Sequence, residues 1–89
     1  MRIPNTVLIG AHKYQIKLVA PNELGNHDDG NVNKEKGVIV LNKKLIRTEI
    51  EAAFIHEVLH VINNELSHET IESLAQQLYL FLTENKLLK

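Results

Sequence analysis

The amino-acid sequence predicts an α+β fold, in which a small antiparallel β-sheet of about three strands is followed by a hairpin of two helices. Before about residue 47, apolar residues come in short runs that turn residues interrupt, which is typical of strands. After that point, apolar residues recur at the spacing of amphipathic helices. A length of 89 residues suits one domain, and we assign residues 1–89 to it.

The first half predicts the strands. The segment TVLIGAHKYQIKLVA predicts two of them, residues 6–9 and 13–19, joined by a turn at residues 10–12. Polar and apolar residues alternate along the second strand, as expected when one face is buried. The following PNELGNHDDGN is rich in turn residues and predicts a loop. A third strand is expected at residues 38–41, because GVIVLN is dense in β-branched side chains.

The second half predicts two helices joined by the turn NNELS. Thr48 and Glu51 have the spacing of a capping box, and the first helix is expected to run from there to about Asn63. Ser67 is a candidate N-cap for a second helix that reaches about Asn85. That helix carries apolar residues at helical spacing: Ile71, Leu74, Ala75, Leu78, Phe81 and Leu82.

The composition excludes several classes of protein. The formal net charge is −1 and the charges are mixed along the chain, so the basic patch of a nucleic-acid-binding protein is missing. No apolar run has the roughly 20 residues of a membrane span, and we expect a cytoplasmic protein without membrane association. The chain has no cysteine, which leaves histidines and carboxylates as its metal ligands.

The first predicted helix contains the sequence HEVLH at residues 56–60. Residues four apart lie on one face of a helix, so His56 and His60 can direct nitrogens at one metal ion. Zinc lowers the pKa of a bound water toward about 7, and the carboxylate of Glu57 can take the proton of that water. This spacing is the one that metal-assisted hydrolysis requires.

The context of HEVLH favours a metal site over a solvated helix face. Apolar residues cover most of the circumference of the helix, which indicates that it is largely buried. Ala52 and Ala53, one turn before His56, leave room for an ion and a substrate. The alternative is a chance match, since a chain with five histidines and nine glutamates can contain HExxH without a metal.

A catalytic zinc usually has three protein ligands and one open position. If the helices run antiparallel, the histidine pair faces about residue 73, and this favours Glu72 as the third ligand. Glu69, which has polar neighbours, is the weaker choice, and an ordinary exposed carboxylate is the alternative for Glu72. His68 is one turn before Glu72 on the same face, where it can hydrogen-bond an oxyanion, act as a fourth ligand or cap the helix.

Other polar residues have two readings each. Tyr79 and Tyr14 can each supply a phenol to an oxyanion, although a core aromatic with its hydroxyl at the edge is the more ordinary role. Asn63 can orient the ring of His60 through a hydrogen bond, or it can cap the end of the helix. A second metal site at residues 27–29, in the segment HDD, competes with a simple polar turn before Gly30.

HEVLH together with the glutamate-bearing helix after it resembles the gluzincin pattern, His-Glu-x-x-His plus Glu. The segment HEVLHVINNELSHETIESLAQQLYLFLTEN is similar to small phage and prophage zinc metallopeptidases, which are grouped with ImmA/IrrE-type peptidases. The resemblance covers most of the chain, and HExxH is its specific part. This chain is shorter than the ImmA/IrrE-type proteins and lacks the additional helices with which larger gluzincins build a deep cleft.

The resemblance implies a zinc site made by His56, His60 and Glu72, with Glu57 as the general base of a hydrolase. It also implies that the strand at residues 38–41 pairs with an extended peptide or protein substrate, such as a regulatory protein. The compartment that it implies is the cytoplasm of a bacterium or of a phage-infected host.

Two functions follow from the sequence. The first is a zinc-dependent metallopeptidase that hydrolyses peptide bonds through a metal-activated water. The second is a zinc-stabilised protein-binding module without catalytic activity, because a metal can supply folding energy to a small core. A metal-free interaction domain ranks last, and the sequence determines no oligomeric state.

Overall fold

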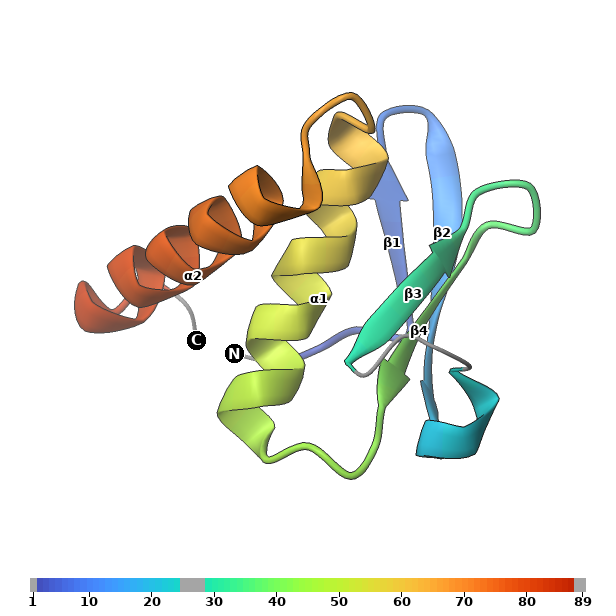
Figure 1. The fold of residues 1–89 in the computed structure, drawn as a ribbon, viewed down its shortest axis with the longest axis horizontal. Helices are drawn as coiled ribbons and strands as arrows, with labels where there is room; N and C mark the ends of the chain where they lie inside the picture. The colour runs from blue at the N-terminus through green and yellow to red at the C-terminus, as the bar shows by residue number, and fades with distance from the viewer. Residues whose placement is uncertain (1, 25–28, 88–89) are drawn as a thin grey trace.

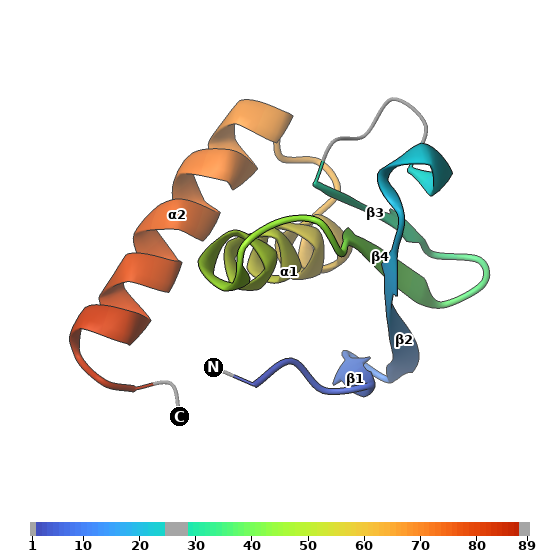
Figure 2. The ribbon, with the colours of Figure 1, turned by 90° about the horizontal axis from the view of Figure 1, so that it is seen from below.

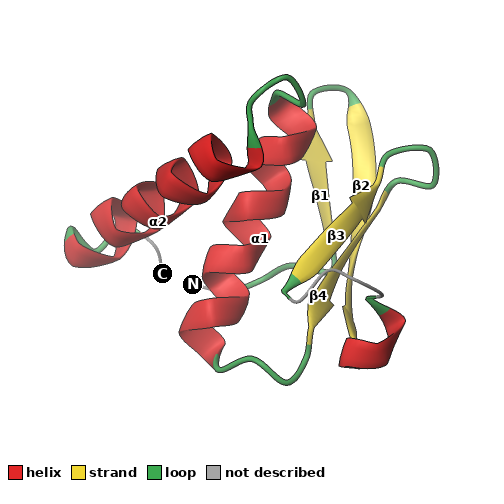
Figure 3. Cartoon of the chain, in the orientation of Figure 1, coloured by secondary structure: helices red, strands yellow, loops and turns green. Residues whose placement is uncertain are grey.

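The computed structural model describes residues 2–24 and 29–87 and has the predicted α+β class, with a sheet that precedes two helices (Figures 1 and 3). Two strands and a short 3-10 helix, η1, come first: β1 (Thr6–Ile9), β2 (His12–Val19) and η1 (Pro21–Glu23). Two more strands and the two long helices follow: β3 (Gly30–Asn33), β4 (Val38–Asn42), α1 (Arg47–Ile62) and α2 (His68–Glu84).

The sheet differs from the prediction in strand number and in direction. It has four strands in the order β1-β2-β4-β3, and it is mixed, because β2 and β4 run parallel. The prediction of about three antiparallel strands was therefore wrong. The additional strand, β3, has the sequence GNVN, which resembles a loop. Strand pairing uses backbone groups, so β3 can pair with β4 without the apolar pattern that marks a strand in sequence.

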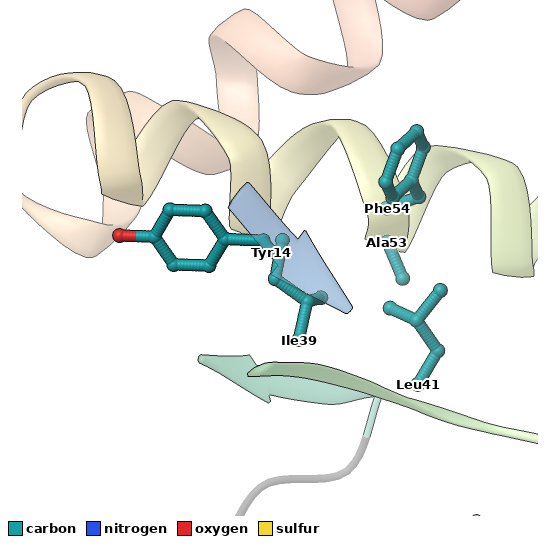
Figure 4. Close-up of a cluster of buried hydrophobic side chains, with 5 residues drawn as sticks. All are labelled: Tyr14, Ile39, Leu41, Ala53 and Phe54. Carbon is teal, nitrogen blue, oxygen red and sulfur yellow. The ribbon is translucent and has the colours of Figure 1, made fainter. Parts of the chain in front are cut away.

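The core lies between α1 and one face of the sheet. Tyr14 of β2, Ile39 and Leu41 of β4, and Ala53 and Phe54 of α1 form its buried cluster (Figure 4). Ile39 and Leu41 are fully buried, since β4 lies inside the sheet and has α1 above it. Burying such a side chain contributes about 1.5–3 kcal/mol to the free energy of unfolding. The contacts of this cluster therefore fix α1 on the sheet.

Helix α1 begins at Arg47, close to the expected position but with a different cap. Its N-cap is Ile46, and the Oε1 of Glu49 accepts a hydrogen bond of 3.2 Å from the Ile46 N–H. The predicted capping box at Thr48 was wrong, because Thr48 is already inside the helix. The helix ends at Ile62, and Asn63 is its C-cap, as one of the two readings of that residue predicted.

Helix α2 has the predicted start and length. The hydroxyl of Ser67 accepts a hydrogen bond from the N–H of Thr70, and the helix ends before Asn85. Figure 2 shows α1 between α2 and the sheet, and Figure 1 shows that α2 runs obliquely away from the end of α1. In the described part of the chain, neither helix combines the length and the apolar character that crossing a membrane requires.

The far end of the contact between the helices is held by a polar interaction. The hydroxyl of Tyr79 donates a hydrogen bond of 2.6 Å to the carboxylate of Glu51, which is buried on α1 and also pairs with Arg47. Burial by itself would raise the pKa of Glu51, but these hydrogen bonds and nearby positive charge outweigh burial and lower it. Desolvation of the Tyr79 hydroxyl and its hydrogen bond to Glu51 raise the pKa of Tyr79 to about 12.

Replacing Tyr79 should therefore loosen α2. In Tyr79→Phe the buried carboxylate of Glu51 loses its hydroxyl donor, and we expect the free energy of unfolding at pH 7 to fall by about 1–2 kcal/mol. A lowered folded-state pKa gives stability that is present above the unfolded value and is lost as the pH falls through the folded value. The difference between wild type and variant should therefore shrink below about pH 4. Urea denaturation across this pH range measures both effects.

Tyr14→Phe is the matched control. It removes the same atom from a buried tyrosine for which no side-chain hydrogen bond is seen in the described part of the chain. We expect a smaller loss of stability in this variant, with no dependence on pH near 4. Equal losses in the two variants would contradict the role assigned to the pair of Tyr79 and Glu51.

Candidate metal centre

Three histidine side chains meet where α1 and α2 approach each other at the turn. His56 and His60 come from α1 and His68 is the first residue of α2. One ring nitrogen from each of them lies within 4.8 Å of the others, and the Nε2 atoms of His56 and His60 are 3.0 Å apart. Of the residues that the structure describes, these are the ones that could together hold a metal ion.

The local sequence explains how His68 reaches the pair. His56 and His60 are one helical turn apart on α1 and share a face. The turn that follows α1 is short: Asn63 caps α1, its Oδ1 accepts a hydrogen bond from the N–H of Glu65, and Ser67 caps α2. This turn places the first residue of α2 beside the last two turns of α1, and the ring of His68 lies with its centroid 4.8 Å from that of His56.

Glu72, the predicted third ligand, lies next to this cluster without joining it. Its Oε2 is 3.9 Å from the Nε2 of His68, and its side chain is 55% exposed. The prediction assumed antiparallel helices, which would bring the middle of α2 to the histidine pair. In the structure, α2 runs obliquely from the turn (Figure 1), and it is His68 in its first turn that joins the histidine pair. A ligand role for Glu72 stays a prediction.

Glu57 is the buried carboxylate of this site. It is 6% exposed, and no hydrogen-bond partner is seen for it among the described residues. Burial and the charge of Asp29 raise the pKa of Glu57 to about 7. Gly30 gives its side chain room, because a Cβ at Gly30 would lie 3.4 Å from the Cγ of Glu57 and only 2.9 Å from the oxygen of Val40.

The surroundings of His56 and His60 favour the neutral form that metals bind. Burial lowers the pKa of His56, the neighbouring charges of His60 and His68 lower it further, and Glu72 opposes them. Burial, His68 and Lys34 lower the pKa of His60. Neutral imidazoles near pH 7 have free lone pairs for a metal.

Two cavities open on this cluster. The larger has a volume of about 450 Å³ and lies between α1, α2 and the start of β3. The smaller, of about 260 Å³, lies along β3 toward the end of α1. Both are lined by Gly30, His56, Glu57 and His68, so a chain that occupied both would pass directly over the histidines. Ala52 and Ala53 line the larger cavity, where their small side chains leave the expected space.

Other residues singled out in the sequence lie elsewhere. The hydroxyl of Tyr79 is hydrogen-bonded to Glu51, and Tyr14 lies in the buried cluster of the core (Figure 4). Neither tyrosine is among the residues that line the two cavities. For the segment HDD, His27 and Asp28 lie outside the described residues, and Asp29 lines the larger cavity.

The strand expected to receive a substrate is not available for pairing. Strand β4 pairs with β2 on one side and with β3 on the other, so the prediction for residues 38–41 was wrong. The strand beside the histidines is β3, which the sequence did not reveal because its side chains are mostly polar. In the sheet order, β3 is an edge strand.

Comparison of the chain with known proteins gives no matching family model, no matching curated protein and no matching solved structure.

Proposed function

We propose that the chain binds one zinc ion through His56, His60 and His68 and hydrolyses peptide bonds in a peptide or protein substrate. The observation that carries the proposal is the meeting of three imidazoles beside the buried carboxylate of Glu57, at the junction of two cavities. Three nitrogen ligands and one open position are the usual composition of a catalytic zinc site.

The donor set suits zinc. Zinc–nitrogen bonds of about 2.0–2.1 Å in a tetrahedral site place the ligand nitrogens about 3.3 Å apart. The two histidines of α1 are near this value at 3.0 Å, and all three donors lie within 4.8 Å of each other. His68 is exposed at the start of α2, so rotation of its side chain can close the remaining gap.

Glu57 has the position of a general base. When bound, zinc supplies Lewis-acid chemistry, because it acidifies a water and polarises a carbonyl. Glu57 follows His56 directly and lines both cavities, so its carboxylate can take a proton from the attacking water and return it to the leaving amine.

A second function, a zinc-stabilised protein-binding module, has its own support. A metal held by His56, His60 and His68 would connect α1 to α2, and α2 has few buried apolar residues of its own, namely Ile71 and Ala75. Metal binding would then add to the stability of the fold. In this function Glu57 has no chemical role.

Metal content tests the ligand set. Purified protein should contain about one zinc per chain by elemental analysis, and His56→Ala and His60→Ala should each lose it. His68→Ala should weaken zinc binding strongly, whereas Glu72→Ala should keep zinc near one per chain. The reverse result for these last two variants would assign the third ligand to Glu72.

His12→Ala is the control, since His12 lies on β2 and is not part of the histidine cluster. It should retain zinc as wild type does. Protein that takes up no zinc after supplementation and dialysis would contradict both proposed functions.

The variant Glu57→Gln separates the two functions. The amide has nearly the same shape but cannot accept a proton, so we expect peptide hydrolysis to fall by a factor of about 10²–10⁴ while zinc remains bound. The measurement is cleavage of a peptide library by chromatography and mass spectrometry, beside elemental analysis of the same samples.

The binding module predicts a different outcome, in which wild type and Glu57→Gln both bind zinc and neither cleaves any peptide. Equal cleavage by the two proteins would contradict the role of Glu57. Loss of zinc in Glu57→Gln would indicate that this carboxylate acts at the metal instead.

A further inference from the structure

The two cavities beside the histidine cluster differ in charge. Among the described residues, the larger one is lined by four carboxylates and by no lysine or arginine. These carboxylates belong to Asp29, Glu49, Glu57 and Glu72. In the lining of the smaller one, the described residues include Lys34 and, besides the shared Glu57, no other carboxylate, so its acidic and basic groups balance. A substrate that crosses the cluster therefore meets an acidic side and a side without net charge.

The acidic groups outnumber the charges of a bound metal. Besides Glu57, three exposed carboxylates line the larger cavity, against the two positive charges of a divalent ion on the histidines. The carboxylates do not themselves form a metal site, because the metal-ligating group found among residues 2–24 and 29–87 consists of the three histidines. The carboxylates of the larger cavity thus lie outside this metal-ligating group and can attract a cationic group of a substrate.

Glu57 adds independent evidence for a ligand. It is more than nine-tenths buried and lines the cavity, and the described part of the chain shows no hydrogen-bond partner for its carboxylate. No buried side-chain nitrogen or oxygen atom of the described residues lacks a hydrogen-bond partner, so the carboxylate oxygens of Glu57 that have no partner reach the surface of the cavity. A hydrogen-bond donor that enters the cavity can contact them.

The walls of the cavity limit the shape of that donor. Ala52 and Ala53 on α1 face Ala75 on α2, and these methyl groups form an apolar lining beside the carboxylates. A lysine or arginine side chain combines an apolar stem with a cationic tip, and it can lay the stem along such a wall. A volume of about 450 Å³ is large enough for either side chain.

We infer that the larger cavity is a specificity pocket for a lysine or arginine side chain of a peptide substrate, next to the bond above the histidines. The cleavage part of this inference rests on the proposed peptidase function, whereas the binding part does not. Lys34 in the smaller cavity disfavours a cationic side chain there, and so favours its entry into the larger cavity.

The test uses zinc-loaded protein and the peptides Ala-Ala-X-Ala-Ala-Ala, in which X is lysine, norleucine or glutamate. Lysine and norleucine have similar length and differ in charge, so their comparison isolates the charge. We expect kcat/KM to follow the order lysine, norleucine, glutamate, with lysine about five-fold above norleucine.

The double variant Glu49→Gln/Glu72→Gln tests the pocket itself. Glutamine retains the Oε1 through which Glu49 caps α1, so the helix start is preserved. We expect this variant to lose most of the preference for lysine over norleucine. The matched control, Glu65→Gln/Glu84→Gln, alters net charge equally at exposed positions outside both cavities and should keep the preference.

A binding measurement separates this inference from the proposed function. In the Glu57→Gln background, fluorescence anisotropy of labelled peptides reports binding without turnover, and three carboxylates still line the cavity. The pocket is supported, even if no peptide is cleaved, when the lysine peptide binds more tightly than the norleucine peptide. Adding Glu49→Gln and Glu72→Gln to Glu57→Gln should remove this difference. If Glu72→Gln alone loses zinc, Glu49→Gln alone gives the same comparison.

Two results would overturn the inference. One is cleavage of all peptides at equal rates, which leaves the peptidase standing without this pocket. The other is a preference for lysine that the control variant loses as fully as the cavity variant does, which would trace the preference to net charge. Circular dichroism of each variant establishes that it is folded before the comparison.

Discussion

The position of α1 between the sheet and α2 is the constraint on which the rest of the structure depends. Phe54 and Ala53 pack on Ile39 and Leu41 of β4, while α2 covers the opposite side of the helix. Because both sides of α1 are covered, the residues of HEVLH that line the cavities lie where α1, α2 and β3 meet. Motif residues that would be solvated on an isolated helix thus become partly buried and converge with His68.

Two buried carboxylates on α1 show how this packing creates different environments. Glu51 accepts hydrogen bonds from Tyr79 and Arg47, and its pKa is lowered although it is buried. Glu57 has no such donor in the described chain, and burial raises its pKa to about 7. The first carboxylate fastens α2 to α1. The second has a perturbed pKa of the kind found at functional sites, because burial disfavours its charged form and no donor compensates for this.

The histidine cluster connects structural and chemical roles of a metal. Its three members come from both helices, so a bound ion would fasten the turn end of α2 while Tyr79 and Glu51 fasten the other end. Between these two points lie the cavity and its alanines. A small domain with a limited core would gain stability from such an ion, and the same ion would lie where the two cavities meet.

The sequence by itself determined the α+β class, both helices to within a few residues, the cap at Ser67 and the shared face of His56, Glu57 and His60. These features depend on contacts between residues close together in the chain, and their spacing records them directly. Only the tertiary structure decided that β3 is a strand, that β2 and β4 are parallel, and that His68 rather than Glu72 lies closest to the histidine pair. Strand pairing is made by backbone groups that no side-chain pattern reports, and the angle between α1 and α2 depends on how their side chains pack.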